Sequence, residues 1–214
     1  KQDIKSALLM NRHIIIVGAP GIGKTTLAKN IAKLLPDIEV IEGCSYHCTP
    51  DAPICPSCKQ LKKHKTVKLQ GIKRFIRIQG SPDLTVEDLL GDIDPIKALK
   101  FGPLSLEAFT PGKIFKANNG VLFFDELNRC PEKLQNALLQ VLEEGKATIG
   151  SYDVDFDVHF IFISTMNPED TSTEKLSDVL LDRFDIIYMD YPESIEIEKK
   201  IVVMKGKKIT NVND

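Results

Sequence analysis

The segment at residues 18–25 constrains the fold of this chain more than any other. It consists of a glycine, four variable residues, a second glycine, a lysine and a threonine. The apolar run 13–17 before it predicts a buried strand, and residues 26–35 after it carry apolar side chains at the spacing of a helix face. A strand, a glycine-rich loop and a helix in this order are typical of a phosphate-binding loop, so we expect one here rather than an ordinary glycine turn.

The residue types of this loop suit phosphate chemistry. Its glycines let successive backbone N–H groups turn toward one centre, and the following helix adds partial positive charge. Lys24 would neutralise the β- and γ-phosphates of a nucleotide, and the hydroxyl of Thr25 would ligate Mg²⁺. The predicted phosphate-binding residues are Gly18, Pro20, Gly21, Ile22, Gly23, Lys24, Thr25 and Thr26.

Length and composition narrow the class of protein. The 214 residues are 43% hydrophobic and 27% charged, which suits one large domain with a sizeable core and a polar surface. The net charge of −2 creates no overall basic field for nucleic acid. We find no apolar run long enough to span a bilayer and no signal peptide, so we expect no membrane binding. A nucleotide-dependent protein implies the cytosol, so we expect a cytoplasmic location. Because the sequence starts at Lys1 rather than Met, we expect a fragment.

Five short apolar runs alternate with helical patterns, which predicts an α/β sandwich around a parallel five-stranded sheet. Three of the runs are apolar at nearly every position, as in strands whose two faces are both covered. The predicted strands are residues 13–17, 74–79, 121–125, 160–165 and 186–190. The clearest helical pattern, residues 131–144, places Pro131 at the first helical position and Gly145 at the C-terminal cap.

Two stretches interrupt this alternation. Residues 37–73 hold four cysteines and a basic run, and residues 81–119 form a long stretch broken by glycine and proline. A structureless loop of that length is unusual in a compact domain, so we expect an insertion with elements of its own. Residues 194–204, which follow Pro192, predict one more helix near the end of the chain.

Polar side chains follow two of the buried runs. Asp125 and Glu126 would lie at the carboxyl edge of the parallel sheet, where such sheets bind ligands. Asp125 could hold Mg²⁺ and Glu126 could polarise the water that attacks a γ-phosphate, although two acids could also cap the next turn. Asn167 could hydrogen-bond both a γ-phosphate oxygen and that water, or it could be a turn asparagine before proline.

An arginine lies between apolar residues just before the last predicted strand. Arg183 could stabilise the charge that spreads over the γ-phosphate during transfer, if it is supplied in trans. A surface salt bridge with Asp182 or Asp185 is the alternative, since neighbouring arginine and aspartate residues are common.

Together these segments resemble the AAA+ ATPases. Residues 18–25, Phe-Asp-Glu at 124–126, Ser-Thr-Met-Asn-Pro at 164–168 and Leu-Asp-Arg-Phe at 181–184 are similar to the family's Walker A, Walker B, sensor 1 and arginine-finger motifs. Residues 81–119 resemble the helix-2 insert, and residues 143–160 the hairpin before sensor 1, of the group formed by the magnesium chelatase ATPase subunit and MoxR-type proteins. The resemblance covers nearly the whole chain.

The resemblance implies a three-layer P-loop NTPase fold and an ATP-binding, Mg²⁺-dependent ATPase. Such motors form homo-oligomers, usually hexameric rings, and Arg183 would then act in the site of a neighbouring subunit. The catalytic residues that it implies are Lys24, Glu126, Asn167 and Arg183, with Thr25 and Asp125 as Mg²⁺ ligands.

The resemblance also implies an organisation and a partner. Residues 1–191 correspond to the nucleotide-binding domain and residues 192–214 to the start of a C-terminal helical lid, so we expect a truncated lid. Motors of the chelatase type work with a protein that carries a von Willebrand A-type domain. They remodel a partner protein or drive metal insertion.

Four of the five cysteines lie within fifteen residues of one another. Cys55 and Cys58 form a tight Cys-x2-Cys pair, and Cys44 and Cys48 form a looser one, which is the pattern of a closed structural Zn²⁺ site. An iron–sulfur cluster, disulfides or free thiols are the alternatives, and His47 or His64 could replace one thiolate. The fifth cysteine, Cys130, is expected to be a small buried residue.

Two other functions stay open. The basic run 62–68 could be a solvated face or a patch for nucleic acid, and minichromosome-maintenance helicases share the hairpin and the insert. Nucleic acid is the less favoured partner because no aromatic residues alternate with these basic positions. A non-catalytic ATP-dependent switch is the third hypothesis, and the presence of Asp125, Glu126 and Asn167 argues against it.

Overall fold

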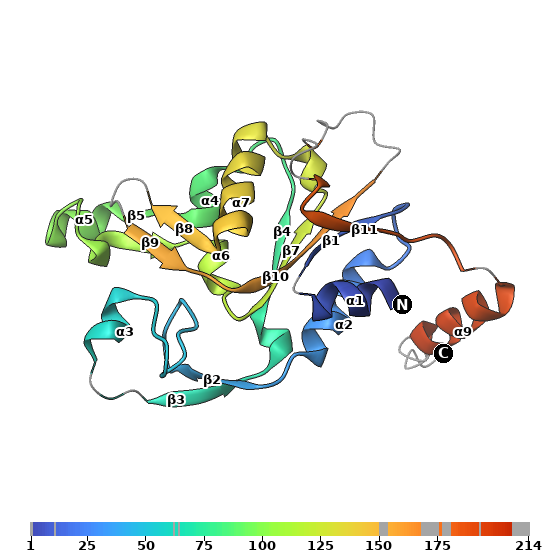
Figure 1. Cartoon of the computed structure of the whole chain (residues 1–214), viewed down its shortest axis with the longest axis horizontal. Helices are drawn as coiled ribbons and strands as arrows, with labels where there is room; N and C mark the ends of the chain where they lie inside the picture. Colours follow the sequence, from blue (N-terminus) through green and yellow to red (C-terminus); the bar gives the residue numbers. More distant parts are fainter. Residues whose placement is uncertain are drawn as a thin grey trace, which may run out of the picture.

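The computed structural model describes residues 2–10, 12–61, 63, 65–149, 154–167, 176, 181–192 and 194–206. Its centre is a parallel sheet of five strands in the order β11-β1-β10-β7-β4 (Figure 1). The strands are β1 His13–Val17, β4 Phe75–Gln79, β7 Gly120–Asp125, β10 Phe160–Met166 and β11 Phe184–Tyr188. The predicted α/β fold with a five-stranded parallel sheet is therefore confirmed.

Four of the five predicted strands differ from the observed ones in their bounds, and β7 and β10 are each one residue longer than predicted. Arg74 ends the 3-10 turn η1 (Gly71–Arg74) instead of starting β4. β11 begins two residues before the predicted run, because Phe184 is buried and pairs with His13, while charged Asp185 conceals the apolar pattern. Apolar side chains alone therefore placed β11 least accurately, and the other strands to within one residue.

Helices cover both faces of the sheet because successive strand residues point to opposite sides. Ile14 and Ile16 pack with α1 (Gln2–Leu9) and α2 (Lys24–Leu34). Ile15 and Val17 belong to the second core, which includes α7 (Glu132–Glu144). Figure 1 shows α1 and α2 on one side of the strands and α7 on the other, which is the three-layer arrangement expected.

The ends of α7 show why it begins and stops where it does. Gly145 caps the helix with φ 63°, as predicted, because a glycine adopts this left-handed conformation without steric cost. Pro131 is the N-cap with extended backbone (ψ 145°) and not the first helical residue, so this prediction was wrong by one position. The helix presents Leu134, Leu138 and Val141 to the core.

Two insertions and a hairpin gather at the end of the molecule away from both termini (Figure 1). The first insertion contains an antiparallel pair of strands and a short helix: β2 Ile38–Ile41, β3 Thr66–Leu69 and α3 Pro56–Gln60. The second contains α4 Val86–Leu90, β5 Gly91–Ile93, α5 Pro95–Phe101, η2 Leu106–Ala108, β6 Phe109–Pro111 and α6 Lys113–Lys116. The hairpin pairs β8 (Lys146–Ile149) with β9 (Val154–Asp157), and Gly150 lies outside the described residues.

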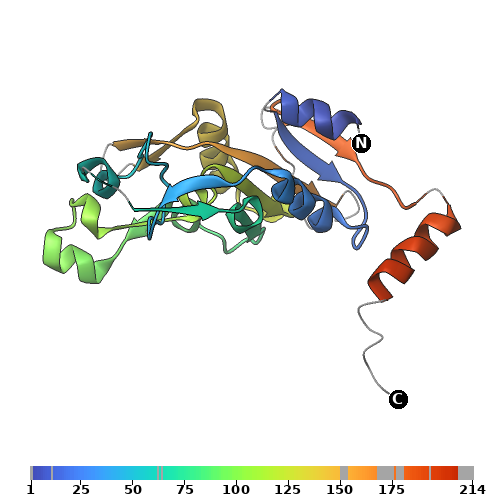
Figure 2. The same ribbon diagram turned by 90° about the horizontal axis from the view of Figure 1, so that it is seen from below.

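The last described helix, α9 (Ile195–Gly206), lies apart from the sheet. Figure 2 shows it projecting beyond the edge formed by β11. Several of its apolar side chains are exposed: Ile195, Ile197, Ile201, Val202, Val203 and Met204. Among the described residues, no helix combines the length and the apolar character that crossing a membrane requires.

Candidate nucleotide site

A cavity of 310 Å³ lies at the carboxyl edge of the central sheet. The phosphate loop, the start of α2, the end of β7 and the end of β10 all contribute to its wall. The lining residues are Pro20, Gly21, Gly23, Lys24, Thr25, Thr26, Asp125, Glu126, Thr165 and Asn167. The structure therefore brings together nine of the residues predicted from the sequence, and it adds Thr165.

The backbone of the loop adopts the conformation for which its glycines are needed. Gly21 and Gly23 have φ angles of 80° and 99°, which side-chain-bearing residues rarely adopt. Gly18 does not line the cavity, but a side chain there would collide with the carbonyl oxygen of Met189 and with Ile22. Ile22 does not line it either. These two predicted residues shape the loop and do not form the wall.

Lys24 lies over the loop with its ammonium group facing backbone oxygens. Its Nζ donates hydrogen bonds to the carbonyl of Gly18 and, at 2.9 Å, to that of Ala19. Burial lowers the pKa of Lys24, and the carboxylates of Asp125 and Glu126 oppose that shift. A flexible cation at the mouth of this loop is suited to exchange its carbonyl partners for a phosphate, whose charge binds an ammonium group more strongly.

Thr165 connects the two acids at the end of β7. Its hydroxyl donates to Oδ1 of Asp125 at 2.6 Å and accepts a hydrogen bond from the backbone N–H of Glu126 at 3.0 Å. Glu126 itself has the left-handed conformation (φ 57°, ψ 55°), which is uncommon for a residue other than glycine. Thr165 is fully buried, so this arrangement is fixed by the β7–β10 pairing.

Three polar residues contact the acids but were not predicted from the sequence. Arg77 contacts Oδ2 of Asp125 at 2.6 Å, and Gln79 donates to Oε2 of Glu126 at 2.9 Å. Arg129 lies 3.3 Å from the same oxygen of Glu126. These groups orient both carboxylates and offset negative charge that would otherwise repel phosphate. For Arg77 and Gln79 the sequence offered only polar positions in the predicted strand 74–79, because their acidic partners are set by the pairing of β4 with β7.

Arg183 lies elsewhere and forms a salt bridge that was not predicted. Its guanidinium contacts Glu143 Oε1 of α7 at 2.6 Å, whereas Asp185 pairs with Arg12 at 2.8 Å. The side chain of Arg183 is half exposed. It does not reach the cavity of its own chain, as expected of a residue that acts in trans, and its catalytic role stays a prediction.

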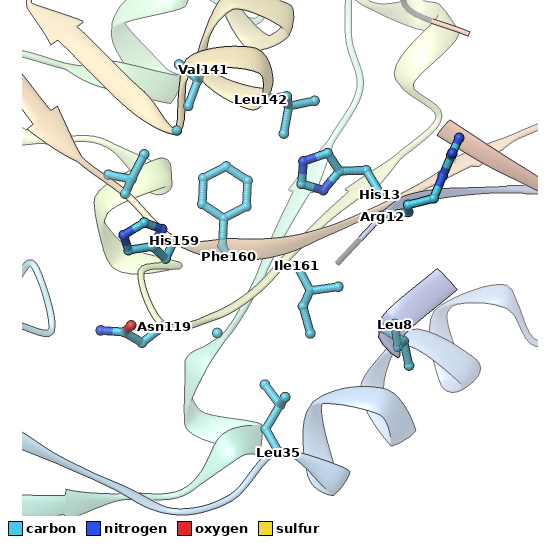
Figure 3. A pocket seen from close by; sticks show the side chains of 13 residues that line it. Leu8, Arg12, His13, Leu35, Asn119, Val141, Leu142, His159, Phe160 and Ile161 are labelled. Atoms are coloured by element: carbon cyan, nitrogen blue, oxygen red, sulfur yellow. The ribbon is translucent and has the colours of Figure 1, made fainter. Parts of the chain in front are cut away.

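A second hollow, of 340 Å³, lies at the amino edge of the same sheet (Figure 3). Aliphatic and aromatic side chains flank strand β10 on its two faces: Val141, Leu142 and Phe160 on one, and Leu8, Leu35 and Ile161 on the other. His13 borders it as well, and burial lowers the pKa of this imidazole. Because parallel sheets bind ligands at the carboxyl edge, the cavity at the phosphate loop is the candidate nucleotide site.

The four clustered cysteines come together in space. The sulfur atoms of Cys44, Cys48, Cys55 and Cys58 all lie within 4.8 Å of one another, and this group contains no histidine. His64 lies outside the described residues. Cys130 is fully buried away from the group, as predicted, and burial raises the pKa of its thiol to about 11.

The basic run near the cysteines is partly neutralised. Lys65 lies 2.9 Å from Glu42, and the β2–β3 register places Lys68 opposite Glu39. Lys62 and His64 lie outside the described residues. The described lysines thus support the interpretation as a solvated face.

Comparison with known families agrees with this geometry. Residues 55–186 match the sequence model of the ATPase family associated with various cellular activities (AAA). Residues 1–75 match the model of a second family, Novel STAND NTPase 3. The two matches together include the phosphate loop, the acids at the end of β7 and the asparagine after β10.

The curated relatives include subunits of magnesium chelatase. The chain is 30% identical over 222 residues to the magnesium-chelatase subunit ChlI homolog of Methanocaldococcus jannaschii, covering 100% of this chain and 58% of the relative. It is 33% identical over 194 residues to the chloroplastic magnesium-chelatase subunit ChlI-2 of Arabidopsis thaliana, covering 86% and 45%. The chain thus spans about half the length of these relatives.

Solved structures agree in fold. The chain superposes with a TM-score of 0.73 and 25% identity on a structure of the complex between subunits BchI and BchD of magnesium chelatase, covering 100% of this chain and 65% of the other. A putative ATPase from Cytophaga hutchinsonii superposes with a TM-score of 0.60 and 26% identity, covering 97% and 48%.

Proposed function

We propose, from the premise that this chain belongs to the AAA family of ATPases, that it binds ATP and hydrolyses it with Mg²⁺ as part of a chelatase-like motor. One observation carries the proposal. The glycine loop, Asp125 and Glu126 at the end of β7, and the polar residues Thr165 and Asn167 of the β10 end line one cavity. Phosphoryl transfer requires a cation on the phosphates, oxygen ligands for the metal and a group that orients water, and all three are present there.

Each residue has a distinct role in this proposal. Lys24 neutralises the β- and γ-phosphates, and the loop N–H groups hold them. Glu126 orients and polarises the attacking water, while Asn167 hydrogen-bonds the γ-phosphate. Thr25 and Asp125 offer the hard oxygen ligands that suit Mg²⁺, which when bound would neutralise phosphate charge. Arg77 holds Asp125 in place but also competes for it, because its guanidinium contacts the same carboxylate.

Binding of a fluorescent ATP analogue with Mg²⁺ tests the site directly. We expect the Lys24→Ala variant to bind at least about tenfold more weakly, since it removes a charge-assisted contact to phosphate. Lys29→Ala is the matched control, because it removes an exposed lysine from the same helix. Equal affinities of the wild type and Lys24→Ala would contradict the assignment.

We further propose that the motor acts as a ring, hexameric in the simplest case, in which Arg183 completes a neighbour's site. The described partner of Arg183 is Glu143 of its own α7, so this salt bridge would have to open on assembly. In the full-length protein, Arg183→Ala should abolish ATPase activity, and mixing it with Lys24→Ala subunits should restore part of it. If mixing restores no activity, Arg183 has only a structural role.

The organisation and the partner are proposals as well. Residues 1–191 would form the nucleotide-binding domain and residues 192–214 would begin a helical lid. The exposed apolar side chains of α9 support this, because they would need a surface to pack on. A related structure contains BchI with BchD, and we propose a protein partner with a von Willebrand A-type domain. Pull-down of the full-length protein from its native extract tests this, and DNA in place of such a partner would contradict it.

We propose zinc as a second, structural metal at the four cysteines. It would be remote from hydrolysis, since the loop that holds these cysteines contacts Asn118 and Asn119 just before β7 begins, whereas Asp125 ends that strand. We also propose a cytoplasmic location, because ATP and reduced thiols are both available there.

A further inference from the structure

We propose that Cys44, Cys48, Cys55 and Cys58 form a closed zinc site, and that this ion holds their loop against the base of the strand that carries the catalytic acids. The first part identifies the ligand of a cluster that has no role in ATP hydrolysis. The second gives the ion a structural task. Neither part depends on the proposed ATPase activity.

The separation of the sulfur atoms identifies the ligand class. Cys44 Sγ lies 3.8 Å from Cys55 Sγ, and all four sulfurs lie within 4.8 Å of one another. A tetrahedral zinc ion with Zn–S bonds of about 2.3 Å separates its sulfurs by about 3.8 Å. A disulfide would need about 2.05 Å between the sulfurs, and an iron–sulfur cluster would place further iron and sulfide atoms between them. The Cys44–Cys55 separation therefore matches that of two sulfurs on one zinc ion, and the other sulfurs lie close enough to complete a tetrathiolate.

Backbone N–H groups point at two of the sulfurs. Cys48 Sγ accepts from the N–H groups of Ile54 at 3.3 Å and Cys55 at 3.4 Å. Cys55 Sγ accepts from the N–H group of Cys58 at 3.4 Å. Such donors stabilise thiolates and orient them toward a metal, as outer partners of metal ligands generally do. The loop thus offers hydrogen-bond donors to sulfur atoms that would be thiolates once a metal is bound.

The segment around the cluster has few other sources of order. Its sheet consists only of the β2–β3 pair, and an isolated pair of strands is marginally stable at best. Strand β3 is almost entirely exposed, and Leu61 and Val67 are exposed as well. The buried apolar residues of this segment are Cys48, Cys55 and Cys58, with Val40 and Ile41, while Cys44 is half-buried. A bound ion supplies the folding free energy that such a segment lacks.

The loop between the first two cysteines contacts the base of β7. Asn118 donates to the carbonyl of Tyr46 at 3.1 Å, and Asn119 donates to that of His47 at 3.5 Å. Asn118 also accepts from the N–H group of His159, next to β10. The Tyr46 ring lies 5.1 Å from Phe115 of α6 and 5.9 Å from Phe156 of β9. Binding of Cys44 and Cys48 to one ion therefore also fixes Tyr46 and His47. The carbonyls of these two residues accept the hydrogen bonds from the residues just before β7.

Metal content of the purified full chain tests the first part. Loading exchanges four thiol protons for one zinc ion, so we expect one equivalent of zinc and proton release on titration. Cobalt(II) added to the metal-free protein should give the visible absorption of a tetrahedral thiolate complex, which zinc should abolish. Less than about half an equivalent of zinc without cobalt absorption would overturn the proposal. Iron with sulfide, or a disulfide in the unreduced protein, would overturn it too.

Cysteine variants assign the ligands. Cys58→Ser should retain less than about a tenth of the zinc, because serine does not replace a thiolate on this metal. Cys130→Ser removes the buried cysteine outside the cluster and should keep a full equivalent. Full zinc retention in Cys58→Ser would overturn the assignment. If Cys58→Ser fails to fold, zinc content and the cobalt spectrum of the wild type still decide.

Amide hydrogen exchange tests the structural task. Removing zinc with a chelator should accelerate exchange in residues 44–58 and at Asn119 and Gly120 by at least about tenfold. Exchange in α2 should stay unchanged, because that helix is held by its own apolar core. Unchanged exchange at Asn119 and Gly120 would overturn the second part of the proposal.

Discussion

The phosphate loop and the cysteine loop are both candidate ligand sites that precede a helix, but they owe their order to different sources. The first joins a buried strand to the eleven-residue helix α2, so packing on both sides fixes it. The second joins a two-stranded pair to a helix of five residues and has little apolar surface of its own. The phosphate loop is ordered by core packing, so it can release and rebind its ligand without losing its fold. The cysteine loop lacks such packing, so its order depends on a ligand that remains bound.

The largest effect should come from the acid that orients water. We expect Glu126→Gln to reduce ATP hydrolysis by the full-length ring by about 10²–10⁴-fold, because the amide cannot act as a base. ATP binding and zinc content should both remain. Glu132→Gln, on the exposed start of α7, is the control. Normal turnover in Glu126→Gln would remove this residue from the mechanism and leave the phosphate loop as a binding site only.

Tyr46 tests whether packing also holds the cysteine loop. Tyr46→Ala should lower the free energy of unfolding by about 2–4 kcal/mol, since the ring packs against Phe115 and Phe156. Zinc content should stay at one equivalent because the ligands are untouched. Urea unfolding measures the difference, and Tyr188→Ala, at an exposed ring, should change it little. Loss of zinc in Tyr46→Ala would mean that packing orders the metal site.

A variant of Thr165 tests how far its hydroxyl stabilises the carboxyl edge of the sheet at the candidate nucleotide site. Thr165→Val keeps the shape but removes the hydroxyl that bonds Asp125 and the N–H of Glu126. We expect a loss of about 1–2 kcal/mol of unfolding free energy, because a buried donor loses its partner. Thr66→Val makes the same change at an exposed position of β3 and should have no comparable effect. Equal urea midpoints for Thr165→Val and the wild type would show that water replaces the hydroxyl.

The smallest effect is the pH dependence of the unfolding free energy that His13, at the amino edge of the sheet, contributes. Burial lowers the pKa of His13 from its ordinary 6.5, and its Nδ1 accepts from the N–H group of Phe162 at 3.4 Å. The unfolded chain therefore binds more protons than the folded one just below pH 6.5. The contribution of His13 to the unfolding free energy is complete above this pH. It should fall as the pH drops, by at most about 1.4 kcal/mol per pH unit.

His13→Asn isolates this contribution. It keeps an acceptor near the same position but does not titrate, so its unfolding free energy should depend less on pH between 6.5 and the lowered value. His159→Asn, at an exposed histidine, should keep the dependence of the wild type. Parallel curves for wild type and His13→Asn would contradict the assignment.

The sequence predicted the central strands well because burial on both faces leaves a clear pattern. Residues 121–124 are apolar at every position, and β7 is indeed covered on both sides. The same approach missed Arg77 and Gln79, because their partners are set by the pairing of β4 with β7. It also misplaced Pro131, whose fixed φ suits the cap and the first helical residue alike. The salt bridge with Asp182 or Asp185, which was the alternative for Arg183, is replaced by one with Glu143, because α7 packs beside it.

The sequence by itself determined the local motifs, whose residues lie close together in the chain. The glycines of the phosphate loop and the Cys55–Cys58 turn are both local, so backbone geometry alone predicts them. Only the tertiary structure decided which residues from distant parts of the sequence contact these local motifs. Thr165 reaches Asp125, and Cys44 reaches Cys55, because strand order and loop packing bring remote segments together. Those long-range contacts depend on how the whole core packs, and the packing cannot be predicted from any single segment of the sequence.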